Sequence, residues 1–155
     1  MKSVTGTMSA VESSDDFIRA PTDAEGFLAA ARTMLEGARV LASASQVPAI
    51  ALSHLCGHAA ESALKAMLSQ VGVPTIELSK PALGHKLTNL WARAVAEGIS
   101  LPKSQDAWFE RLHRVHATPY TLRYPLGLHA IVLPDSATML RGVEELISKA
   151  AACVQ

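Results

Sequence analysis

Residues 48–71, PAIALSHLCGHAAESALKAMLSQV, predict a long helix at the centre of the fold. Pro48 suits the first turn of a helix, and Gly72, directly after the stretch, suits its C-terminal end. Apolar and small side chains cover most of the helix circumference, and a helix of this kind must be packed on several sides. The stretch therefore predicts a helical bundle built around residues 48–71.

Four further helices are predicted from apolar side chains that recur every three or four residues. Thr22 and Glu25 have the spacing of a capping box, Ser104 is expected to cap a later helix, and Asp135 or Ser136 to begin the last one. The predicted ranges are 22–45, 84–97 (ending at Gly98), 105–116 and 135–152. The connections, 72–83 and 119–134, are expected to be irregular, with a short extended piece at 128–133. The fold class is thus an all-α, antiparallel up-and-down bundle of about five helices.

Composition supports one helical domain, which we place at residues 21–155 behind a flexible arm at 1–20. About one residue in six is alanine and only 5% are aromatic, which favours helix over strand. Lys+Arg and Asp+Glu balance at 14 each, so a protein that coats DNA is not expected. Every apolar run is interrupted by polar residues and the N-terminus lacks a signal-peptide layout, so we expect a cytoplasmic protein that does not enter the membrane, with two reduced cysteines.

Polar side chains gather on one face of the central predicted helix. At about 100° per residue, His54, His58, Glu61 and Lys65 fall within a stripe roughly 100° wide. Two interpretations stay open: a solvated stripe on a helix buried on its other sides, or a polar cleft that binds a ligand. His54 and His58 have the i,i+4 spacing of metal ligands, but no nearby motif supplies a third ligand, so no metal and no cofactor are predicted.

Three motifs resemble those of the HEPN domain superfamily: HAAESALKAML at 58–68, GHKL at 84–87 and Arg123-Tyr124-Pro125. The resemblance covers roughly residues 22–150. It implies a homodimeric helical bundle, often encoded beside or fused to a minimal nucleotidyltransferase. The first functional hypothesis is therefore a binding or accessory module for a nucleotide-like or phosphate-bearing ligand, or for a nucleotidyltransferase partner. Its candidate ligand-binding residues are His58, Glu61, Lys65, His85, Arg123 and Tyr124.

A second hypothesis is a toxin-like, metal-independent endoribonuclease. Many HEPN proteins carry Arg-x4–6-His, which Arg111 and His116 match by spacing, and such a pair suits proton transfer and phosphorane stabilisation on RNA. Thr118, however, stands where that branch often has Tyr. Residues 76–125 hold seven Lys/Arg against four acids, which fits an anionic ligand site better than a broad nucleic-acid track. A purely structural dimerisation domain is the third hypothesis.

Overall fold

Helices alone make up the regular structure of this computed structural model, which describes residues 19–117 and 130–154. The predicted all-α bundle is therefore confirmed. Within those ranges the structure contains six helices and no strand. Their bounds are α1 Asp23–Ala42, α2 Ala49–Gln70, α3 Thr75–Leu78, α4 Leu87–Ala96, α5 Ala107–His116 and α7 Ser136–Cys153.

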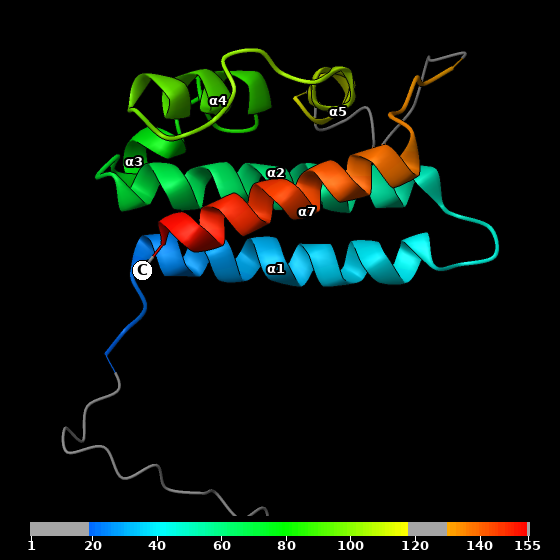
Figure 1. Cartoon of the computed structure of the whole chain (residues 1–155), viewed down its shortest axis with the longest axis horizontal. Coiled ribbons are helices and arrows are strands. Elements are labelled where there is room, and N and C mark those ends of the chain that lie inside the picture. The colour runs from blue at the N-terminus through cyan, green and yellow to red at the C-terminus, as the bar shows by residue number, and fades with distance from the viewer. Residues whose placement is uncertain (1–18, 118–129, 155) are drawn as a thin grey trace, which may run out of the picture.

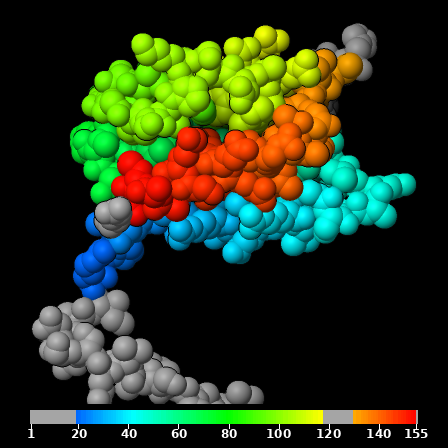
Figure 2. Space-filling model, in the orientation of Figure 1, coloured from blue at the N-terminus to red at the C-terminus, as the bar shows by residue number. Residues whose placement is uncertain are grey.

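The central position of α2 is also confirmed. α1 and α2 run in opposite directions, and α7 runs alongside both in the direction of α2 (Figure 1). α4 and α5 lie on the other side of α2 from α1, and α2 contacts α1, α4, α5 and α7. In the space-filling view α7 covers much of α2 (Figure 2). Figure 1 shows α5 nearly end-on, so this helix crosses the bundle instead of following its long axis.

Most helices begin or end close to the capping residues that were predicted from the sequence. The Thr22 side chain accepts from the Glu25 backbone N–H at 3.2 Å, and the Glu25 carboxylate accepts from the Thr22 N–H at 2.7 Å. Gly72 and Gly98 have φ of +96° and +81° and end α2 and α4 with paired backbone hydrogen bonds typical of a Schellman motif. Asp135 caps α7 by accepting from the Thr138 N–H at 2.9 Å.

Some local predictions are wrong or fall outside the described residues. Ser104 does not cap α5; Asp106 occupies the N-cap position, without a side-chain capping bond. The connection 72–83 contains the short helix α3, which is too brief to produce a periodic pattern but buries Leu78. Residues 130–133 are irregular rather than extended strand, and 128–129 lie outside the described ranges. Most of the predicted arm also lies outside them, since the description begins at residue 19.

Small residues allow the helices to approach closely. Ala31 and Ala38 of α1 and Ala59 and Ala63 of α2 are completely buried. Where α5 meets α7, Gly142 leaves the space that the Trp108 indole fills, and a Cβ built on Gly142 would overlap that ring. Among the described helices, none is long and apolar enough to cross a membrane.

The Trp108–Gly142 contact predicts that Gly142→Ala destabilises the fold. The added methyl group overpacks a rigid ring, which costs about 1–3 kcal/mol in the free energy of unfolding. Gly26→Ala is the matched control, because nothing lies within 4 Å of a Cβ at that helical position; it should be neutral or stabilise by about 0.5–1 kcal/mol. Urea denaturation of both variants measures the difference, and equal stabilities would contradict the packing described.

Candidate functional site

Glu61 lies at the centre of a cluster of polar side chains on α2. Its Oε1 accepts a hydrogen bond from Lys65 Nζ at 2.6 Å. Its Oε2 lies 2.9 Å from Nδ1 of His85, which precedes α4, and 2.7 Å from Nε2 of His116, the last residue of α5. Glu61 is 6% exposed. One buried carboxylate therefore joins α2 to the segment before α4 and to the end of α5.

Glu61 is ionised near neutral pH despite its burial. Burial alone raises the pKa of this carboxyl, but the hydrogen bonds from His116, Lys65 and His85 outweigh it and lower the pKa to about 2. An ionised carboxylate has no proton to donate. The ring nitrogens of His85 and His116 that face Glu61 must therefore carry hydrogen.

His58 lies beside this carboxylate without bonding to it. Its ring centroid is 4.6 Å from that of His54, 4.9 Å from that of His116 and 6.4 Å from that of His85. Burial, reinforced by His116 and His54, lowers the pKa of His58 to about 4, so the imidazole is neutral at pH 7. Within the described residues, His58 makes ring contacts but no hydrogen bond.

Gly57 makes room for His116. A Cβ built on Gly57 would overlap the His116 ring at Nδ1, so any larger residue would displace the imidazole from Glu61. The sequence analysis did not single out Gly57. The available signal was a glycine inside a strongly predicted helix, which costs helix stability and calls for a packing reason.

The structure brings four of the six predicted ligand-binding residues together: His58, Glu61, Lys65 and His85. The interpretation as a fully solvated stripe does not hold at Glu61, because α5 and the segment before α4 cover it. The side chain of Lys65 is 12% exposed and is engaged by Glu61. Arg123 and Tyr124 lie outside the described residues.

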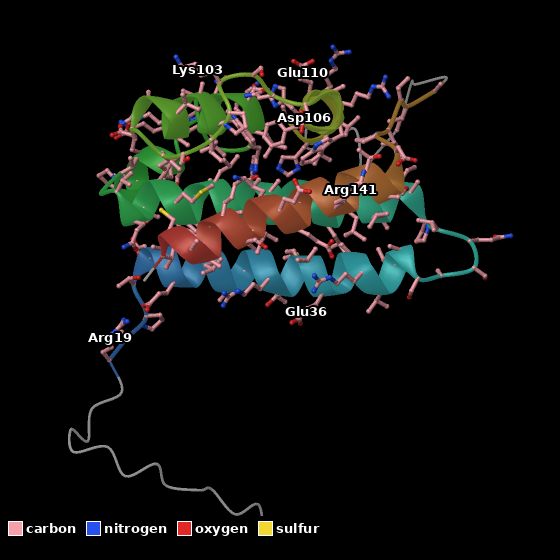
Figure 3. The ribbon with its side chains drawn as sticks, in the orientation of Figure 1. Arg19, Glu36, Lys103, Asp106, Glu110 and Arg141 are labelled. Atoms are coloured by element: carbon pink, nitrogen blue, oxygen red, sulfur yellow. The ribbon has the colours of Figure 1, made fainter. Side chains whose placement is uncertain are left out.

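Arg111 and His116, the candidate catalytic pair, project to different sides of α5. Five residues correspond to 500° of helix rotation, so the two side chains are about 140° apart. His116 is 4% exposed and faces α2, whereas Arg111 is exposed. In Figure 3 the neighbouring Glu110 also points outward from α5.

An exposed cation, Lys86, lies at the exposed edge of the cluster. The side chain of His85 is 51% exposed, and Lys86, the next residue, is exposed as well. His113 of α5 lies 3.1 Å from Thr88 Oγ1, and its pKa is lowered by burial and by the nearby charge of Lys86, with smaller effects from His116 and Arg114. Lys86 therefore lies near both His85 and His113, whereas Arg114 is about 160° around α5 from His116 and does not face the cluster.

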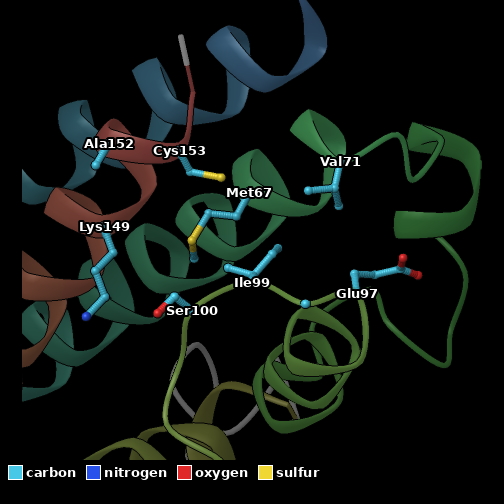
Figure 4. A pocket seen from close by; sticks show the side chains of 9 residues that line it. Met67, Val71, Glu97, Ile99, Ser100, Lys149, Ala152 and Cys153 are labelled. Atoms are coloured by element: carbon cyan, nitrogen blue, oxygen red, sulfur yellow. The ribbon is translucent and has the colours of Figure 1, made fainter.

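A separate, mainly apolar pocket of about 420 Å³ lies between the ends of α2 and α7 and the start of the α4–α5 connection. Figure 4 shows Met67, Val71, Ile99 and Cys153 around it. None of the residues that line it belongs to the Glu61 cluster.

Comparisons of the chain with protein-family models, with curated proteins and with solved structures find no match.

Replacing Glu61 with Gln should destabilise the protein strongly. The variant keeps the shape of the side chain but leaves the buried Lys65 ammonium without its counter-ion, and breaking a buried pair in this way costs about 3–5 kcal/mol. Glu36→Gln on the exposed face of α1 is the control and should change the free energy of unfolding by less than about 0.5 kcal/mol. Chemical denaturation at neutral pH checks both values. Similar free energies of unfolding for the two variants would contradict the view that the Glu61 carboxylate holds the cluster together.

The lowered pKa of His58 predicts a loss of stability in mild acid. Between pH 6.5 and pH 4 the unfolded chain binds a proton at His58 that the native protein does not, so the free energy of unfolding falls as pH decreases through this window. The groups that face His58 are His54, Glu61, His85 and His116. In His58→Gln the fall should be shallower across the same window. Parallel pH profiles for wild type and variant would contradict the assignment.

Proposed function

We propose that the protein is a HEPN-like helical binding module that holds a phosphate-bearing, nucleotide-like ligand at the exposed edge of the Glu61 cluster. The observation that carries this proposal is the orientation of His85. Glu61 fixes the ring through Nδ1 at 2.9 Å, while half of the side chain stays exposed. The ring is thus held in position, and no residue of 19–117 or 130–154 bonds to its other nitrogen, which can meet a ligand.

The charges around His85 favour an anion. Lys65 neutralises Glu61 inside the cluster, at 2.6 Å. Lys86 is exposed and forms no ion pair with the residues that the structure describes. Phosphate groups are bound in proteins by cationic side chains and by hydrogen-bond donors held in place. Lys86 beside a positioned imidazole supplies both.

The endoribonuclease hypothesis has weaker support than binding. Nε2 of His116 is engaged by Glu61 and the ring is almost completely buried, so this imidazole is poorly placed to reach a 2′-hydroxyl group. Arg111 projects from another side of α5. A homodimer and a nucleotidyltransferase partner remain predictions of the resemblance.

Binding of adenosine 5′-monophosphate and of inorganic phosphate, measured by calorimetry in EDTA, tests the proposal. His85→Ala and Lys86→Ala should each weaken binding by about tenfold or more, because each removes a contact worth about 1.4 kcal/mol. Arg32→Ala is the control: this exposed cation lies on α1, on the other side of α2, and its loss should change the affinity by less than about twofold.

Two outcomes would overturn the binding proposal. The first is that neither probe binds the folded wild-type protein, or that His85→Ala and Lys86→Ala bind both probes as wild type does. The second is RNA cleavage in EDTA that is lost in His116→Ala at unchanged folding, which would establish the ribonuclease hypothesis instead.

A further inference from the structure

Three side chains of the cluster have the composition of a metal site. His58 and Glu61 of α2 and His116 of α5 each offer one ligand atom, and the three atoms lie within 4.8 Å of one another. We propose that His58, Glu61 and His116 bind one divalent transition-metal ion, with Zn²⁺ as the best match. The ion would meet other atoms than the phosphate-bearing ligand does, although Glu61 Oε2 also holds His85 of the phosphate-binding edge.

The donor set matches the chemistry of such ions. Imidazole nitrogen suits zinc, iron and nickel, and two imidazoles with one carboxylate form the three-ligand set of many catalytic zinc centres. Such a set leaves one coordination position for water or for another ligand. Magnesium and calcium prefer oxygen ligands, so they fit this set poorly.

His58 is the side chain that the hydrogen-bond network does not explain. Glu61, Lys65, His85 and His116 are joined by direct hydrogen bonds, whereas His58 lies in the same cluster and bonds to none of them. Its ligand atom lies within 4.8 Å of those of Glu61 and His116 and makes no hydrogen bond to either, so it is close enough to share an ion with them.

Residues around the three ligands fix their positions, as hydrogen-bond partners of ligands do in known metal sites. Lys65 binds Oε1 of Glu61 and fixes the plane of the carboxylate. Oε2 would meet the ion when His116 Nε2 gives up its hydrogen bond to this oxygen, while His85 keeps its own. His58 and Glu61 are three residues apart on one rigid helix, so they share a face. Gly57 gives His116 its place beside them.

Binding requires small movements and a proton shift within His116. Zinc–ligand bonds of about 2.0–2.2 Å separate tetrahedral ligand atoms by roughly 3.3 Å. Glu61 Oε2 and His116 Nε2, now 2.7 Å apart, must therefore separate slightly while His58 moves inward. The proton on His116 Nε2 moves to Nδ1, so the ring stays neutral and Nε2 becomes the ligand atom.

Cobalt and zinc titrations of the metal-free, full-length protein test this site. Co²⁺ in a three- or four-ligand nitrogen and oxygen environment absorbs visible light, and the titration should end at one ion per chain, with Zn²⁺ displacing Co²⁺. His58→Ala should weaken Co²⁺ binding by about 100-fold or more, because a direct ligand is lost. Arg32→Ala is the control: this exposed side chain lies on α1, on the other side of α2, and its loss should change the affinity by less than about threefold.

Circular dichroism establishes that His58→Ala and Arg32→Ala are folded. The proposal is overturned if folded wild-type protein binds neither ion with a Kd below about 100 µM, or if His58→Ala binds Co²⁺ as wild type does. Nucleotide binding is measured in EDTA, and metal binding in a buffer without phosphate or nucleotide. Failure of one proposal is therefore distinguishable from failure of the other.

Discussion

The buried carboxylate of Glu61 is the constraint on which the rest of this structure depends. A charge removed from water is costly unless it is paired and hydrogen-bonded, and α2 alone supplies only Lys65. The other two donors come from His85 and His116, so the segment before α4 and the end of α5 must both reach α2. This requirement accounts for a short helix, α5, that lies across the bundle while the long helices pack along it (Figure 1).

The same carboxylate gives three histidines different chemical properties. His116 is buried and held, His85 is held but open to solvent, and His58 is neutral and has no hydrogen bond within the described part of the chain. An accessible, oriented imidazole beside an exposed cation supports anion binding. An imidazole without a hydrogen bond beside a carboxylate and a second imidazole supports metal binding. The two proposals thus arise from different histidines of one cluster, share Glu61, and are tested under separate conditions.

The sequence predicted the helices and the part of the cluster that lies on α2. Apolar periodicity and capping residues place α1, α2, α4, α5 and α7 within a few residues, and the i,i+4 rule joins Glu61 to Lys65 because both lie on one helix. The approach of His85 and His116 depends on the rotation of α5 and on the path of a connection, which periodicity does not determine. Arg111 and His116 show the same limit. Their spacing matches the Arg-x4-His motif, but on a helix two residues five positions apart point to different sides. The role of Gly57 becomes evident only when its neighbour across the interface is known.

Nuclear magnetic resonance of the imidazole nitrogens tests the central position of Glu61 most directly. Long-range ¹H–¹⁵N spectra at neutral pH report which ring nitrogens carry hydrogen. We expect hydrogen on Nδ1 of His85 and on Nε2 of His116, the two nitrogens that face the ionised carboxylate, and we expect Glu61→Gln to shift both signals. An unprotonated nitrogen at either position, or spectra unchanged by Glu61→Gln, would contradict the account.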